Sequence, residues 1–224
     1  MPTLQQARLW YPDDDPVHGF DHVLRVYRMA ERLALAEGAD LEIVGAAVLL
    51  HDAQAVDQGL GISDQADANS NHAVVRLNHH QAAAEFASDV LRAEGWPAGR
   101  IAAVQHCIRA HRFRDNSEEP QTLEAQILFD ADKLDAIGAI GAARAVAYAA
   151  RHGQPAYAFP SESFLRSGQT EPGEQHSAYH EYLFKLSKLK ERLYTPAARL
   201  VAEERHRYMV EYFERLAAES LGEM

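Results

Sequence analysis

The sequence predicts an all-α protein, a helical bundle with a C-terminal helical extension, on three observations. Good helix formers dominate, and alanine is abundant throughout. Apolar residues recur at helical spacing, and few runs of β-branched residues alternate with polar ones. No internal repeat, low-complexity tract or linker divides the chain, so its 224 residues are expected to form one domain, with a core over about 18–151 and C-terminal helices over about 176–221.

The first two helices are predicted to form an antiparallel pair. One is expected over residues 22–37, with Asp21 as its N-cap and Gly38 as its C-terminal stop. Asp40 can cap the next helix, over residues 41–51, which is apolar almost all round and should therefore be central. Because the turn between the two is short, the start of the first helix should lie near the end of the second.

The rest of the chain contains helical segments separated by stretches rich in glycine, proline or short polar residues. Residues 53–71 are expected to form a loop and residues 153–175 an irregular segment. Thr122 can cap a long helix in which Gly138 and Gly141 indicate close packing against a neighbour. The predicted helices cover residues 73–94, 100–111, 123–151, 177–194 and 196–221.

Composition narrows the classes of function. The formal net charge of −11 disfavours binding to nucleic-acid polymers, which depends on many contacts from Lys and Arg to phosphate. Cys107 is the single cysteine, so an internal disulfide and a thiolate zinc site are excluded. No apolar signal core precedes residue 16, and no window approaches the run of about eighteen apolar residues that a spanning helix needs. A cytoplasmic protein without a membrane partner is expected, and a homodimer is left open.

The dipeptide His51-Asp52 directly follows the most apolar helix. A buried imidazole and carboxylate are costly unless they are paired or bound to an ion. In the alternative interpretation, His51 interacts with the dipole at a helix C-terminus and Asp52 is solvated. The dipeptide alone favours neither interpretation. The antiparallel packing predicted above would bring His22 towards both residues, which favours an ion site.

A second acidic group lies in the segment from Asp130 to Asp135, where three Asp occur within six residues among apolar neighbours. A solvated acidic stripe is the alternative, but the apolar residues that continue the helix weaken it. One carboxylate from this segment would complete a site with two imidazoles and two carboxylates. Such a nitrogen and oxygen donor set suits Mn²⁺, Mg²⁺, Co²⁺, Fe²⁺, Ni²⁺ or Zn²⁺ and leaves positions open for water and substrate.

The order His22, His51-Asp52, Asp132 resembles the H…HD…D signature of the HD-domain superfamily of metal-dependent phosphohydrolases. Three segments carry the resemblance further: DHVLRV at 21–26, HCIRAH at 106–111 and DADKLDAIGAIGAAR at 130–144. It continues into the C-terminal helices through FKL at 184–186 and KL at 188–189, so it covers nearly the whole chain. These segments are similar to a bacterial subfamily that includes uncharacterised HD hydrolases and nucleoside triphosphate pyrophosphohydrolases. The resemblance implies an HD-type helical bundle and selects Asp132, rather than Asp130, as the fourth metal ligand.

Further residues could act on a substrate at this site. Arg25 shares a helix face with His22 and could reach a phosphate, or it could be a surface Arg paired with a carboxylate. Lys133 could neutralise phosphate charge or pair with Asp130. Asp135 is a candidate general acid or base, with Glu85 and the extra histidines as alternatives. The residues expected to contact substrate are His80, His106, His111, Arg144, Lys185 and Lys188. For the histidines, a second ion site or a core position is the alternative, and for the lysines a solvated helix face.

These residues predict hydrolysis of a phosphate ester or anhydride. The expected substrates are nucleotides, with nucleoside triphosphates cleaved to a monophosphate and pyrophosphate. Dephosphorylation of nucleoside monophosphates, or of another phosphoester, is the first alternative. A di-iron oxygenase and a non-catalytic nucleotide-binding protein are the alternatives from other classes of function.

Overall fold

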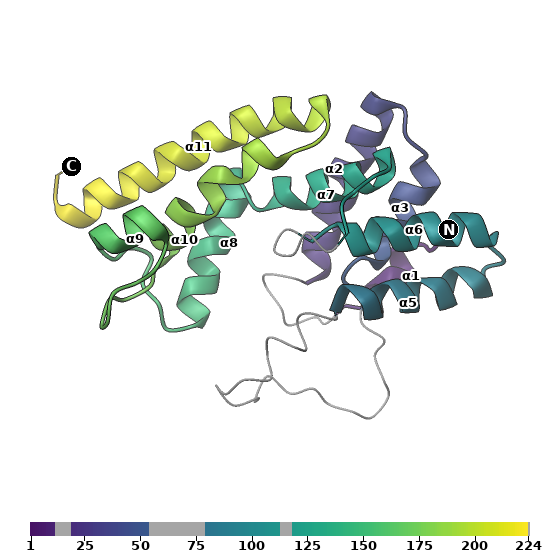
Figure 1. Ribbon diagram of the computed structural model, residues 1–224, viewed down its shortest axis with the longest axis horizontal. Coiled ribbons are helices and arrows are strands. Elements are labelled where there is room, and N and C mark those ends of the chain that lie inside the picture. The colour runs from purple at the N-terminus through teal and green to yellow at the C-terminus, as the bar shows by residue number, and fades with distance from the viewer. Residues whose placement is uncertain (12–18, 54–78, 113–117, 224) are drawn as a thin grey trace. The chain divides into compact units, whose positions relative to one another are not determined.

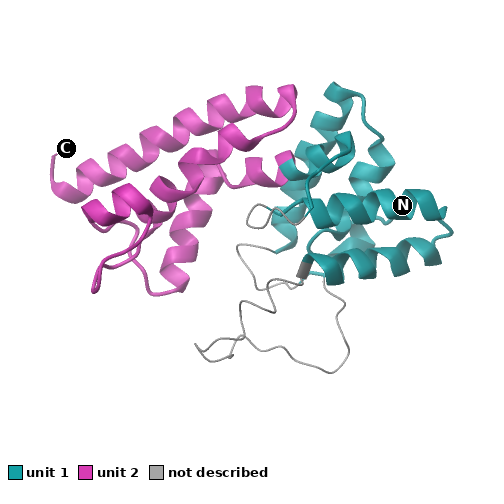
Figure 2. Ribbon diagram, in the orientation of Figure 1, with its two compact units in different colours: residues 1–14, 19–129 teal, residues 15–18, 130–224 magenta. Residues whose placement is uncertain are grey.

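The computed structural model describes residues 1–11, 19–53, 79–112 and 118–223 (Figure 1). Within these ranges the chain forms ten α-helices and one 3₁₀ helix and contains no strand, which confirms the all-α prediction. None of the helices described is both long enough and apolar enough to cross a membrane. The described residues fall into two compact units, divided in sequence between Phe129 and Asp130 (Figure 2).

Unit 1 is built around a buried central helix. It contains α1 (Leu4–Arg8), α2 (Phe20–Glu37), α3 (Leu41–Leu50), α5 (His79–Ala93), α6 (Ala98–Ala110) and the first part of α7 (Leu123–Asp135). The seven residues from Val44 to Leu50 of α3 are all buried, and the helix packs against α2, α5 and α6. The sequence correctly predicted α3 as central, whereas α1 was not predicted. Residues 54–78, which carry most of the predicted loop and the start of the predicted helix 73–94, lie outside the described residues.

The turn between α2 and α3 is determined by two residues. Gly38 ends α2 in the left-handed region, at φ 76°, which costs glycine little because it has no Cβ. Asp40 caps α3, since its Oδ1 accepts hydrogen bonds from the backbone N–H groups of Glu42 and Ile43 at 3.0 and 3.1 Å. Both caps were predicted. The predicted N-cap of α2 was wrong: Gly19 occupies that position, and Asp21 lies within the first turn.

Unit 2 contains the end of α7, α8 (Gly138–Arg151), α9 (Glu162–Ser167), α10 (Ala178–Phe184), the 3₁₀ helix η1 (Leu186–Arg192) and α11 (Pro196–Leu221). The prediction for α11 is confirmed at both ends. The helix predicted over 177–194 changes at Lys185 from α10 to η1. The segment predicted as irregular, 153–175, contains the short helix α9.

The single helix predicted over 123–151 is two helices, because the chain turns at residues 136–137. Ile137 is extended, and Gly138 begins α8 at φ 78°, a backbone conformation that residues other than glycine rarely adopt. Gly141 sits tightly against this turn, as its predicted packing role requires. A Cβ there would lie 2.2 Å from the carbonyl oxygen of Ala136 and 2.8 Å from Cε of Met209.

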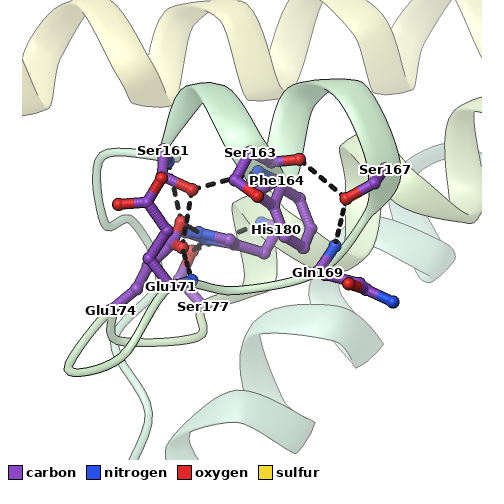
Figure 3. A network of polar contacts seen from close by, with 9 residues as sticks. All are labelled: Ser161, Ser163, Phe164, Ser167, Gln169, Glu171, Glu174, Ser177 and His180. Atoms are coloured by element: carbon purple, nitrogen blue, oxygen red, sulfur yellow. Dashed lines mark hydrogen bonds and ion pairs between the residues drawn. The ribbon is translucent and has the colours of Figure 1, made fainter.

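A polar network in unit 2 joins the starts of α9 and α10 (Figure 3). The Glu174 carboxylate accepts hydrogen bonds from the backbone N–H and the hydroxyl of Ser161, both at 2.7 Å, and from the N–H of Glu171 at 2.6 Å. His180 donates to the same carboxylate from Nε2 at 3.1 Å, and its Nδ1 lies 2.7 Å from the hydroxyl of Ser177. Glu174 therefore links the residues at the starts of α9 and α10.

Ser177, His180 and Glu174 are hydrogen-bonded in the same sequence as the residues of a Ser-His-acid catalytic triad, but their surroundings indicate a structural role. A nucleophilic hydroxyl must reach a substrate, whereas Ser177 is only 1% exposed. Its Oγ also caps α10 by accepting a hydrogen bond from the backbone N–H of His180 at 3.3 Å. We therefore assign this network to stability.

The network predicts a pH dependence of stability. Hydrogen bonds, the one from the Ser161 N–H above all, lower the pKa of Glu174 from 4.5 to about 2. The ionised carboxylate therefore contributes its full stabilisation above pH 4.5, and the contribution is lost as the pH falls through about 2. We expect Glu174→Gln to lower the free energy of unfolding at pH 7 and to lower it less at pH 3. Urea unfolding at both pH values measures this, and an equal loss at the two would contradict it.

The packing of Gly141 predicts a large cost for one added methyl group. Gly141→Ala should lower the free energy of unfolding by about 1–3 kcal/mol, because the methyl group would overlap a backbone oxygen. Gly99→Ala is the matched control, since Gly99 lies in α6 and a Cβ there meets nothing within 4 Å. It should change stability by less than about 1 kcal/mol, in the stabilising direction. Urea unfolding compares the two, and equal effects would show that the close approach is not a constraint.

Candidate metal centre

Three residues in unit 1 converge as a potential set of metal ligands. His22, His51 and Asp52 each offer a ligand atom, and these atoms all lie within 4.8 Å of one another. His22 comes from the first turn of α2, and His51 and Asp52 follow the last turn of α3. Both imidazoles are buried, whereas Asp52 is partly exposed. The packing of α2 on α3 thus brings His22, at the start of α2, close to the end of α3. The short turn between the two helices predicted this arrangement.

The imidazole of His51 is oriented by the helix that it follows. Its Nδ1 lies 2.7 Å from the carbonyl oxygen of Val48, which can only accept, so Nδ1 carries the proton. In the neutral ring, Nε2 then presents a lone pair, and it lies 3.4 Å from Oδ2 of Asp52. The ring of His22 is close by, with its centroid 5.8 Å from that of His51. A backbone carbonyl that fixes the tautomer in this way is typical of histidines that bind metals.

His111, predicted to contact substrate, lies beside this cluster. It follows the last turn of α6, and its Nδ1 donates to the carbonyl of Ile108, as His51 does to Val48. Its Nε2 lies 3.7 Å from Oδ1 of Asp52, and its ring centroid is 5.2 Å from that of His51. His111 therefore faces the carboxylate of the site.

His106, five residues earlier on α6, has a different environment. Its Nδ1 lies 2.6 Å from Oε1 of Glu118, and its Nε2 accepts a hydrogen bond from the backbone N–H of Gln121. Burial raises the pKa of Glu118, but hydrogen bonds from Arg109 and His106 outweigh it, so the pKa lies below its ordinary value. Both ring nitrogens of His106 thus contact protein groups, and its role in substrate binding stays a prediction.

Two further residues of unit 1 stand out near the ends of these helices. His80, a predicted substrate contact, is buried, and its Nδ1 accepts a hydrogen bond from Arg112 at 3.1 Å. Tyr11 was missed by the sequence analysis because no motif surrounds it. Its hydroxyl donates to the carbonyl of Leu49 at 3.1 Å, and burial, together with the negative charge of Asp52, raises the pKa of Tyr11.

The predicted phosphate-binding Arg25 lies on α2, one turn after His22. Its guanidinium forms an ion pair with Asp21 at 2.6 Å. This is the carboxylate partner that the alternative interpretation expected for a surface Arg. A phosphate would have to compete with this partner, so the catalytic role of Arg25 stays a prediction.

The other predicted site residues belong to unit 2. Nζ of Lys133 lies 2.5 Å from Oδ2 of Asp132, and the two side chains are 10% and 18% exposed. Asp135 is buried and pairs with Arg144 at 2.7 Å. Asp130 is fully buried and accepts three hydrogen bonds from residues 194 and 195. The roles of Asp132, Lys133, Asp135 and Arg144 at the site stay predictions.

Lys185 and Lys188 contact residues of their own segment. Lys185 forms an ion pair with Glu181 at 2.7 Å, one helical turn away. Nζ of Lys188 lies 5.0 Å from the centre of the Phe184 ring, a cation–π contact. The phosphate clamp predicted for these lysines stays a prediction.

The donor set in unit 1 fits a divalent cation. Two imidazole nitrogens and one carboxylate form the mixed nitrogen and oxygen environment that first-row metals accept. His51 is held in the neutral tautomer that can bind a cation, and the carboxylate supplies the negative charge. A catalytic ion commonly has three or four protein ligands and keeps at least one position for water or substrate.

Comparison with known proteins shows the family of this chain. The HD domain family profile matches residues 19–137, a range that begins at the N-cap of α2 and ends just after α7. The uncharacterized protein YpgQ of Bacillus subtilis is 31% identical over 229 residues, which cover 99% of this chain and 96% of YpgQ.

Solved structures extend the likeness to the fold. The crystal structure of Bacillus subtilis YpgQ in complex with ADP is similar with a TM-score of 0.67 and 28% identity, over 97% of both chains. An HD-superfamily hydrolase from Bacillus thuringiensis gives a TM-score of 0.66 and 29% identity, over 96% of this chain and 93% of that one. The chain therefore belongs to the HD-domain family, as its sequence motifs indicated.

Proposed function

We propose that this protein is a metal-dependent phosphohydrolase that cleaves nucleotides. The observation that carries the proposal is the convergence of His22, His51 and Asp52 within 4.8 Å, with His51 held by Val48 in a metal-binding tautomer. A histidine cluster that served only packing would not require a carboxylate at the same point. Hydrolysis is also the activity for which solved relatives are named.

Asp132 is the proposed fourth ligand. Of the acidic residues at the end of α7, Asp130 is fully buried and engaged by residues 194 and 195, and Asp135 is paired with Arg144. Asp132 has a partly exposed carboxylate, which lies beside the flexible side chain of Lys133. These contacts support the choice that the sequence resemblance made.

The bound ion would supply Lewis acidity, which lowers the pKa of a coordinated water and withdraws charge from a phosphoryl oxygen. The side chains of the protein would do the rest. His51 and its carbonyl partner keep the site rigid, and Lys133 and Arg25 would compensate the negative charge that develops on phosphate. His111, which faces Asp52, would contact the substrate next to the ion. Asp135, the proposed general acid or base, would have to act from within its pair with Arg144.

Nucleotides are the proposed substrate class for two reasons. YpgQ, which matches this chain over almost its full length, was crystallised with ADP. In addition, a protein with a formal net charge of −11 needs local positive charge to hold an anion. A metal ion beside Arg25 and Lys133 would provide it. The proposed reaction converts a nucleoside triphosphate into the monophosphate and pyrophosphate.

The first test is metal binding. Mn²⁺ should raise the melting temperature, because an ion at one hundred times its Kd adds about 2.7 kcal/mol to stability. His51→Ala should abolish most of this gain. His152→Ala is the matched control, because His152 also bonds a backbone carbonyl through Nδ1, at 2.8 Å, but is exposed at the end of α8. Differential scanning calorimetry with and without Mn²⁺ measures the gain, and an unchanged gain in His51→Ala would remove the site from consideration.

The second test is turnover. With Mn²⁺ and a panel of nucleoside tri-, di- and monophosphates, the protein should release pyrophosphate from triphosphates. Asp52→Asn should lower kcat/KM by about 100-fold or more, because it removes a ligand charge. Asp89→Asn, an exposed carboxylate paired with Arg92 in the same unit, should retain wild-type activity. Ion chromatography identifies the products. Phosphate from monophosphates alone would establish the alternative phosphatase, and release of neither product would refute the proposal.

A further inference from the structure

The end of α7 is held in place by the start of α11. Asp130 is fully buried, and its Oδ1 accepts a hydrogen bond from the backbone N–H of Tyr194 at 2.9 Å. Its Oδ2 accepts two more, from the N–H and the hydroxyl of Thr195, at 2.8 and 2.7 Å. Charge-assisted hydrogen bonds of this kind are stronger and more directional than neutral ones. All of these residues belong to unit 2.

Thr195 acts on both helices with one hydroxyl group. It is the N-cap of α11, where Oγ1 accepts a hydrogen bond from the N–H of Ala198 at 3.3 Å. The same hydroxyl donates its proton to Asp130. One hydroxyl group thus connects the beginning of α11 to Asp130 of α7.

Two arginines secure the last turn of α7. Arg205, on α11, donates a hydrogen bond to the carbonyl of Leu134. Arg144, on α8, donates to the carboxylate of Asp135 at 2.7 Å and to its backbone carbonyl at 3.3 Å. The carbonyls of Leu134 and Asp135 lie at the helix end, where the regular α-helical pattern of backbone donors stops. The contacts therefore fix the end of α7 on both sides of Asp132.

Helix geometry explains why this matters for Asp132. Residues two apart point about 200° apart around an α-helix, so Asp130 and Asp132 occupy nearly opposite faces. A contact that holds Asp130 therefore fixes the direction of Asp132. If the helix rolled by about 20°, an atom at its outer radius would move by about 2 Å. Metal–ligand distances tolerate only about 0.2 Å.

We infer that Asp130 and Thr195 are positioning residues for the metal ligand Asp132, through the rotational setting of α7. The inference rests on the proposed function, because it requires Asp132 to bind the ion. It gives the C-terminal helix α11 a role in the metal site that a purely stabilising extension would not have.

Mn²⁺ affinity, measured on the full chain by electron paramagnetic resonance, tests this role. Asp130→Asn retains the shape of the side chain but replaces one accepting oxygen with a donor, and it should weaken Mn²⁺ binding by about tenfold or more. Glu174→Gln is the matched control: it too removes a carboxylate that accepts backbone hydrogen bonds in unit 2, but it does not contact α7. It should lower the melting temperature and leave Mn²⁺ affinity within about twofold of wild type.

A second pair of variants covers the case in which Asp130→Asn does not fold. Thr195→Val should weaken Mn²⁺ binding, and Thr195→Ser, which keeps the hydroxyl, should restore it. Wild-type Mn²⁺ affinity in folded Asp130→Asn and Thr195→Val, or an equal loss in Glu174→Gln, would overturn the inference. Asp132→Ala separates this result from the proposed function. If that variant binds Mn²⁺ weakly, only the positioning role fails; if it binds normally, the ligand assignment and the inference fall together.

Discussion

The hydrogen bond from His51 to the carbonyl of Val48 is the interaction on which the candidate metal centre depends. At the end of a buried apolar helix, the last carbonyls have no helical donor, and an imidazole has no water to bond. One contact satisfies both groups and leaves Nε2 as a lone pair beside Asp52. The end of α6 repeats the arrangement, with His111 bonded to Ile108 and its Nε2 turned to the same carboxylate. The two helices thus end in the same local structure around one carboxylate.

The positive groups that we propose to act on the substrate are already paired. Arg25 contacts Asp21, Lys133 contacts Asp132, and Arg144 contacts Asp135. In a strongly acidic protein, such pairs keep cations in place without a substrate and limit repulsion among the carboxylates. On substrate binding, each cation would exchange its carboxylate partner for the phosphate. Its net contribution to the binding free energy is therefore smaller than its charge suggests. A divalent ion would contribute more, because it brings charge that the chain does not have.

The sequence predicted those features that are encoded locally. Gly38 and Asp40 determine a short turn through their own backbone and side-chain preferences, and the antiparallel packing of α2 on α3 follows from that turn. The break before α8 was missed because the surrounding residues favour a helix, and nothing local distinguishes Gly138 from a tolerated helical glycine. The partners of Asp130 were also out of reach, since they lie 64 and 65 residues further along the chain. Long-range hydrogen bonds leave no periodicity in the sequence.

The boundary of the family signature does not coincide with a boundary of the structure. The HD domain profile ends at residue 137, yet Asp130, within it, finds its hydrogen-bond donors at residues 194 and 195. A fragment that ended at residue 137 would lack those donors, so the carboxylate of Asp130, which is buried in the intact chain, would lose its hydrogen-bond partners. The end of α7 would also lose its contact with the start of α11. The carboxylate of Asp130 therefore keeps all three donors only in a chain that extends past the family signature to residue 195. In the sequence α11 looks like an appendage, but the residues at its start supply the hydrogen-bond donors for a buried carboxylate within the family signature.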